Sequence, residues 1–182
     1  MYTKRTVLKA LFWLLCAAVL LAGLMVSVYL HRIHRYDDLI AQISREHHVD
    51  PRLVSAVIWQ ESRFNAEVTG ASGEIGLMQV TELVGLTWAK ESGFEEFHTD
   101  ALYDPEINIR AGTWYLARAI RMWSDRSDPL PYALAQYNAG RSNALRWAKG
   151  DEGESSRFIE NITYPGTRDY VESVLKRYRG RV

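Results

Sequence analysis

The feature that most constrains this chain is an uncharged apolar run near its N-terminus, over residues 10–30. As an α-helix this run would be roughly 30 Å long, which matches the hydrocarbon core of a bilayer. Lys4, Arg5 and Lys9 precede it. A cleaved signal peptide is the alternative, but the run is long for a signal and no small-residue cleavage site ends it. The sequence therefore predicts an uncleaved membrane anchor over residues 1–35.

After the anchor, apolar residues recur at helical spacing and no alternating strand pattern is found. Asp50-Pro51 and Asp104-Pro105 each place an N-cap acid before a proline at the first helical position, which is typical of a helix start. We therefore expect a mainly α fold, with a single domain over residues 36–182. Three further helices are expected over residues 77–88, over residues 132–137, and after Thr167 as N-cap.

Charge and composition argue against several kinds of partner. The formal net charge is zero, with 22 basic and 22 acidic residues, whereas nucleic-acid-binding proteins normally carry a basic excess. Cys16 is the only cysteine, so no intrachain disulfide can form. The five histidines show no metal-ligand spacing, and no phosphate-binding glycine loop occurs. We expect no nucleic-acid partner, no metal and no cofactor.

One carboxylate, Glu61, falls on the apolar stripe of the helix that is expected to begin after Asp50. With a period of 3.6 residues, Glu61 shares a face with Leu53 and Val57. Partial desolvation there would raise the pKa of Glu61, as a general acid requires near neutral pH. The alternative is a glutamate at the end of the stripe that reaches solvent or pairs with Arg63.

Four short blocks, in one order along the chain, surround this glutamate. The blocks are Glu61-Ser62-Arg63-Phe64-Asn65, Gly76-Leu77-Met78-Gln79, Ala135-Gln136-Tyr137-Asn138-Ala139-Gly140 and Thr167-Arg168-Asp169-Tyr170-Val171. Each block is short, but their combination extends over nearly all of the chain beyond the anchor. Together they resemble the lytic transglycosylase family of the soluble-lytic-transglycosylase, lysozyme-like type.

The resemblance implies a lysozyme-like fold and cleavage of peptidoglycan between N-acetylmuramic acid and N-acetylglucosamine. Glu61 would protonate the glycosidic oxygen and then act as base, while the muramic C6 hydroxyl attacks C1 and leaves a 1,6-anhydro end. The residues expected to bind the glycan are Met78, Gln79, Tyr137, Asn138 and Tyr164. For Met78 core packing is an equal alternative, and Asn138 also suits a turn.

Three positions depart from the pattern of the family. Gly166 and Thr163 stand where glutamate and proline are usual, and Gly70 stands where many members have serine. A lysozyme-type hydrolase on the same fold is the nearest alternative, and a non-catalytic glycan-binding scaffold is another. A hydrolase would usually need a second carboxylate, and the sequence offers four candidates that it cannot place: Glu67, Glu74, Glu82 and Glu160.

The expected partners are peptidoglycan strands, the membrane and a candidate envelope-spanning assembly. Basic residues lie on both sides of the apolar run, so charge does not determine its orientation. Because peptidoglycan lies outside the cytoplasmic membrane, the expected activity places the chain in the bacterial inner membrane, single-pass, with its domain on the periplasmic side.

Overall fold

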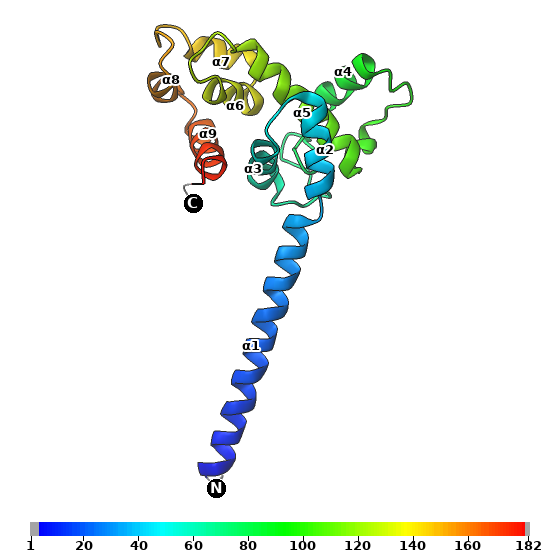
Figure 1. The fold of residues 1–182 in the computed structure, drawn as a ribbon, viewed down its shortest axis with the longest axis vertical. Coiled ribbons are helices and arrows are strands. Elements are labelled where there is room, and N and C mark those ends of the chain that lie inside the picture. Colours follow the sequence, from blue (N-terminus) through cyan, green and yellow to red (C-terminus); the bar gives the residue numbers. More distant parts are fainter. Residues whose placement is uncertain (1–3, 181–182) are drawn as a thin grey trace. The chain divides into compact units, whose positions relative to one another are not determined.

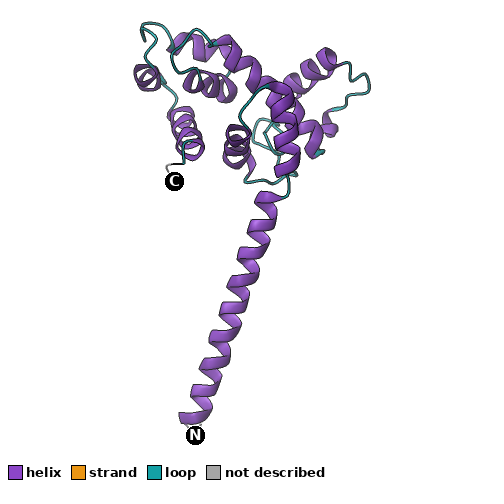
Figure 2. Cartoon of the chain, in the orientation of Figure 1, coloured by secondary structure: helices purple, strands orange, loops and turns teal. Residues whose placement is uncertain are grey.

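The computed structural model describes residues 4–180, which form helices joined by loops without a strand (Figure 2). Two isolated bridges pair Thr69 with Ile75 and Ile75 with Val80. The expected mainly α fold is confirmed. The chain divides into two compact units, Met1–Asp37 and Asp38–Val182, and each is described by itself.

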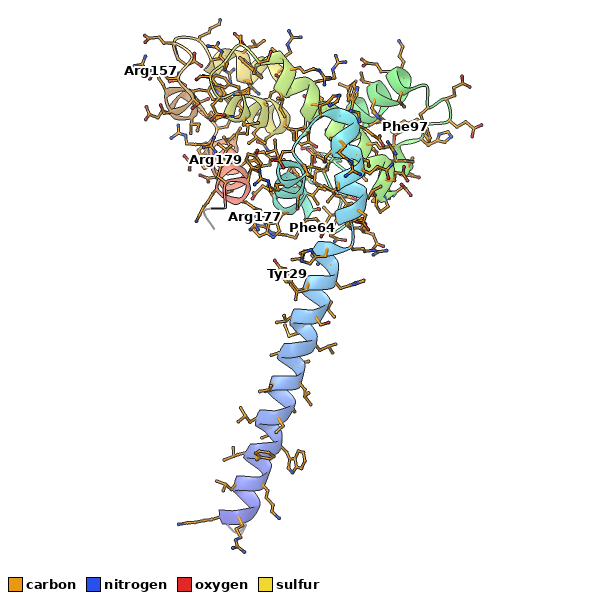
Figure 3. All side chains as sticks on the ribbon, in the orientation of Figure 1. Tyr29, Phe64, Phe97, Arg157, Arg177 and Arg179 are labelled. Atoms are coloured by element: carbon orange, nitrogen blue, oxygen red, sulfur yellow. The ribbon has the colours of Figure 1, made fainter. Side chains whose placement is uncertain are left out.

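Helix α1, Lys4–His34, is the long helix drawn in blue in Figure 1. Its most apolar window of 18 residues has a mean hydropathy of 2.5, and none of that window is buried. Large apolar side chains such as Leu20 are exposed along it, and Tyr29 projects from it in Figure 3. Among the described residues, this helix is long and apolar enough to cross a membrane.

The elements after α1 are α2 (Asp37–His47), α3 (Pro51–Ser62), α4 (Glu82–Ser92), the 3₁₀ helix η1 (Thr99–Tyr103), α5 (Pro105–Met122), α6 (Leu130–Ala139), α7 (Arg141–Trp147), α8 (Ser155–Asn161) and α9 (Pro165–Tyr178). Four helices of the second unit pack around α6, namely α5, α7, α8 and α9. Helix α9 also packs against α3, so an early and a late helix of the unit lie side by side.

The two predicted Asp-Pro helix starts are confirmed. The Asp50 side chain accepts a hydrogen bond from the backbone N–H of Arg52 at 2.8 Å, at the start of α3. The Asp104 side chain accepts from the N–H groups of Glu106 and Ile107 at the start of α5. Each acid satisfies backbone donors that the first helical turn leaves unpaired.

Two other predicted helix starts are wrong. The helix expected from residue 77 begins only at Glu82, because Gly76 and Gln79 have positive φ angles of 77° and 47° that interrupt a helix. The last helix begins at Pro165, since proline suits its first turn, and Thr167 lies inside that turn rather than capping it.

Candidate active site

Glu61 lies in the last turn of α3, and it is partly buried. Burial in this environment raises the pKa of Glu61 from 4.5 to about 7. The cause is desolvation, which disfavours the ionised carboxylate. Arg63, the alternative ion-pair partner, turns to Trp59 instead: it donates a hydrogen bond to the Trp59 carbonyl at 2.9 Å. Glu61 can therefore hold a proton near neutral pH.

Two ionisable side chains from different elements also shift the pKa of Glu61. After burial, the Tyr170 hydroxyl on α9 has the largest effect and lowers the pKa of Glu61, while the charge of Glu74 raises it. The Tyr170 oxygen lies near the carboxylate but makes no hydrogen bond of standard geometry within the described residues. Burial and the nearby Glu61 charge raise the pKa of both Tyr170 and Tyr137 well above 10, so both tyrosines stay neutral.

An open cleft with a volume of about 360 Å³ contains Glu61. One side of it is helical, with Glu61 from α3 and the end of α6, and the other side is the loop that joins α3 to α4. This volume falls within the range of small-molecule and cofactor sites. The lining residues are Glu61, Gly70, Ala71, Ser72, Glu74, Gln79, Thr81, Tyr137 and Asn138.

The loop side of the cleft is held by Asn108, a fully buried residue of α5. Its amide nitrogen donates to the carbonyls of Ile75 and Leu102 at 2.8 and 2.7 Å. Its amide oxygen accepts from the Met78 N–H at 2.8 Å. Asn108 is not among the site residues predicted from the sequence, where its only signal is a polar side chain beside the apolar stripe of the helix after Asp104.

Gln79 reaches the cleft with its oxygen rather than with its nitrogen. Its amide nitrogen donates to the carbonyls of Val68 and Gly76 at 3.1 and 3.0 Å, which uses both N–H groups. A Cβ atom built at Gly70 would lie 2.7 Å from the amide oxygen of Gln79. Gln79 therefore offers a ligand an acceptor.

Met78 lies behind the cleft and does not line it. Its side chain is fully buried, and its sulfur accepts a hydrogen bond from the Thr113 hydroxyl at 3.7 Å. Its backbone carbonyl accepts a hydrogen bond from the Tyr137 hydroxyl at 2.8 Å. The Tyr137 proton is thus committed to the backbone, and the Tyr137 oxygen can act only as an acceptor.

The other two residues expected to bind the glycan differ in position. Asn138 lines the cleft, and its side-chain oxygen accepts a hydrogen bond from the Thr167 hydroxyl at 2.7 Å. Tyr164 is 46% exposed and packs edge-on against Trp147, with ring centroids 5.2 Å apart. The structure therefore brings Glu61, Gln79, Tyr137 and Asn138 together, while Met78 and Tyr164 stay outside the lining.

A stack around Trp59 joins α3 to α9 close to the cleft. The guanidinium carbons of Arg63 and Arg177 lie 3.1 and 3.3 Å from the Trp59 ring centroid. Both distances are well within the range of cation–π contacts. Figure 3 labels Arg177 on α9, the same helix that carries Tyr170. The stack thus helps to hold Tyr170 beside Glu61.

Comparisons with curated proteins give related sequences. A soluble lytic murein transglycosylase of Salmonella typhimurium is 29% identical over 143 residues, which are 77% of this chain and 22% of that protein. A membrane-bound lytic murein transglycosylase C of Shigella sonnei is 33% identical over 153 residues, which are 81% of this chain and 42% of that protein. The chain thus spans less than half the length of either relative.

Solved structures give the same picture. The 70 kDa soluble lytic transglycosylase of Escherichia coli is 28% identical with a TM-score of 0.72, covering 80% of this chain and 24% of that one. An inactive E503Q mutant of lytic transglycosylase Slt from Pseudomonas aeruginosa is 26% identical with a TM-score of 0.71, covering 80% of this chain and 23% of that one. The family model of the transglycosylase SLT domain matches residues 38–159, and this chain therefore belongs to that family.

Proposed function

We propose that this chain is a membrane-anchored lytic transglycosylase that cleaves the β-1,4 bond between N-acetylmuramic acid and N-acetylglucosamine in peptidoglycan. The observation that carries the proposal is Glu61, a partly buried acid with a pKa of about 7 in an open cleft of an SLT domain. A carboxyl that is protonated near neutral pH is the group that can donate a proton to a glycosidic oxygen.

The proposed reaction uses Glu61 twice. Protonated Glu61 gives its proton to the bridging oxygen as the bond from that oxygen to C1 breaks. The muramic C6 hydroxyl then bonds to C1, and its proton passes to the Glu61 carboxylate, which restores the acid. The nearby Tyr170 hydroxyl favours the ionised form of Glu61 between these steps, because it lowers the pKa of that carboxyl.

Intramolecular capture explains how a single acid/base group can suffice. Because the C6 hydroxyl belongs to the same sugar, its effective concentration exceeds what bulk water provides. The N-acetyl group of the substrate can also assist at C1, as in other substrate-assisted glycosidases. The names of the relatives support the reaction class. The Pseudomonas enzyme supports it further, because that protein is inactive when one glutamate is replaced by glutamine.

Product analysis in heavy-oxygen water tests the proposal. Purified sacculi are digested in labelled water, and the released muropeptides are weighed by mass spectrometry. The expected product is anhydro-muramic, unlabelled and lighter by about one water than a hydrolysed product, because the nucleophile comes from the substrate. Labelled reducing ends as the main product would identify a lysozyme-type hydrolase. If no glycan is cleaved, the chain is a non-catalytic binding scaffold.

The proposed location is the cytoplasmic membrane, with α1 as a single span and the domain on the periplasmic side. Support comes from the exposed apolar length of α1 and from the membrane-bound relative. A reporter that is active only outside the cytoplasm, fused after Val182, should be active. The N-terminus should remain uncleaved. A silent reporter, or a chain that begins after about residue 25, contradicts this placement.

A further inference from the structure

Glu74 is a second carboxylate in the cleft that contains Glu61. It comes from the loop between α3 and α4, and it lines the cleft together with Gln79. Its charge acts on Glu61 directly, because it raises the pKa of that carboxyl. Among the described residues, the ion pairs involve other carboxylates, so Glu74 has no basic side chain that neutralises it at ion-pair distance.

The loop holds the Glu74 carboxylate in a defined place. One carboxylate oxygen accepts a hydrogen bond from the Ser72 N–H at 3.0 Å. The Glu74 carbonyl accepts from the Gly70 N–H at 2.7 Å, which closes a tight turn. A Cβ atom at Gly70 would collide with that same carboxylate oxygen. The glycine therefore leaves the space in which the carboxylate of Glu74 lies beside the amide oxygen of Gln79.

An acceptor-rich cleft with an unneutralised charge suits a substrate that becomes positive. When the glycosidic bond breaks, positive charge develops at C1 and the ring oxygen of the sugar. A fixed negative charge in a partly desolvated site stabilises such a transition state without reorganisation. The Tyr137 and Gln79 oxygens act only as acceptors, so they also present partial negative charge to the sugar.

We propose that Glu74 stabilises the positive charge that develops on the sugar during bond cleavage, an inference that rests on the proposed function. The proton balance stays with Glu61: its proton goes to the leaving oxygen, and the C6 hydroxyl proton returns to it. Glu74 neither gains nor loses a proton. Its carboxylate also keeps Glu61 protonated to higher pH by like-charge repulsion.

The test is Glu74→Gln, which removes the charge but keeps an oxygen for the Ser72 N–H. We expect kcat to fall about tenfold or more, with KM changed by less than about threefold, because the lost interaction belongs to the transition state. The groups facing Glu61 are Tyr170 from α9, Tyr137 from α6 and Glu74 from the loop. Both tyrosines are neutral, so Glu74 is the charged group among them, and its loss lowers the pKa of Glu61. The basic limb of the pH profile of kcat/KM should therefore move to lower pH.

Two further variants make the test specific. Glu67→Gln removes the same charge from an exposed residue of the same loop, outside the cleft lining, and should leave both readouts unchanged. Glu74→Asp keeps the charge and should retain more activity than Glu74→Gln. Unchanged kcat and an unmoved limb in Glu74→Gln overturn the inference while the proposed function stands. Full activity in Glu61→Gln would overturn the proposed function itself.

Discussion

The two sides of the cleft are built by different physical means. On the helical side, Glu61, Tyr137 and Tyr170 are placed by the packing of α3, α6 and α9 around apolar faces. On the loop side, Glu74 and Gln79 are placed by backbone hydrogen bonds and by unusual φ angles. The helical side therefore depends on many interchangeable apolar contacts, whereas the loop side depends on a few polar contacts, each of them hard to replace.

The largest expected effect is on the helical side, in Glu61→Gln. The variant can neither donate nor accept the catalytic proton, so turnover on sacculi should fall by about 100-fold or more. The substitution is nearly isosteric, so the helices should remain folded. Residual turnover above a few per cent of the unsubstituted enzyme would show that another residue is the acid.

The same variant also has a stability prediction with a definite sign. Because the native pKa of about 7 exceeds the ordinary 4.5, the folded state loses stability as pH rises between these values. At pH 8, Glu61→Gln should therefore have a higher free energy of unfolding than the unsubstituted protein, by roughly 1–3 kcal/mol. Urea unfolding at pH 4 and pH 8 measures this, and an equal difference at both values contradicts the assigned pKa.

The next effect is on the loop side, in Asn108→Ala. Three buried backbone groups lose their hydrogen bond to Asn108, and only the Ile75 carbonyl keeps another, from the Val80 N–H. The free energy of unfolding should therefore fall by about 2–4 kcal/mol, and kcat/KM should fall roughly tenfold. Urea titration and initial rates measure the two effects. Asn143→Ala is the matched control: it removes one hydrogen bond to the Ala139 carbonyl and one exposed hydrogen bond from the Arg146 side chain, and it should cost about 1 kcal/mol without affecting turnover. Equal losses in both variants would remove the special role of Asn108.

A smaller effect is expected from Gly70→Ala. The added methyl group displaces the Glu74 carboxylate and the Gln79 oxygen, so kcat/KM should fall a few-fold with little change in stability. Gly166→Ala is the matched control, because a Cβ atom there meets nothing within 4 Å. Kinetics on one defined glycan substrate compares the two. A fully active Gly70→Ala variant would show that the loop side tolerates displacement.

The smallest effect is expected from Tyr170→Phe, on the helical side. The hydroxyl lowers the pKa of Glu61, so its removal raises that pKa. The basic limb of the pH profile should then move to higher pH, opposite in direction to the shift in Glu74→Gln. Initial rates across pH 5 to 9 give the direction. A shift to lower pH would mean that Tyr170 does not face the ionised carboxylate.

The sequence predicts the helical side well, because helical period and Asp-Pro starts are local signals. Asp50 fixes the start of α3, and the period from there brings Glu61 to the buried face. The cleft position of Tyr137 is harder to predict from sequence alone. Its block marks it as a candidate, but only tertiary packing shows its hydroxyl on the Met78 carbonyl and Tyr170 beside Glu61.

The loop side is hard to predict, because its contacts join distant parts of the sequence. The conformation around Met78 depends on Asn108, which lies 30 residues away. No sequence signal marks the left-handed conformation of Gln79, since glutamine rarely adopts a positive φ. Because the loop conformation cannot be predicted from the sequence, the sequence also does not show that Glu74, rather than Glu67, faces Glu61. The expected helix from residue 77 is wrong for this reason as well.

The packing of α9 against α3 has a consequence for the order of folding. Glu61 and Tyr170 are more than one hundred residues apart, and chains are synthesised from the N-terminus. A nascent chain that contains Glu61 therefore still lacks Tyr170 and the Arg177 face of the Trp59 stack. Such long-range contacts form late, after the intervening loop-closure entropy has been overcome. A chain whose synthesis stops before Pro165 contains Glu61 but lacks α9, so the surroundings of Glu61 stay incomplete.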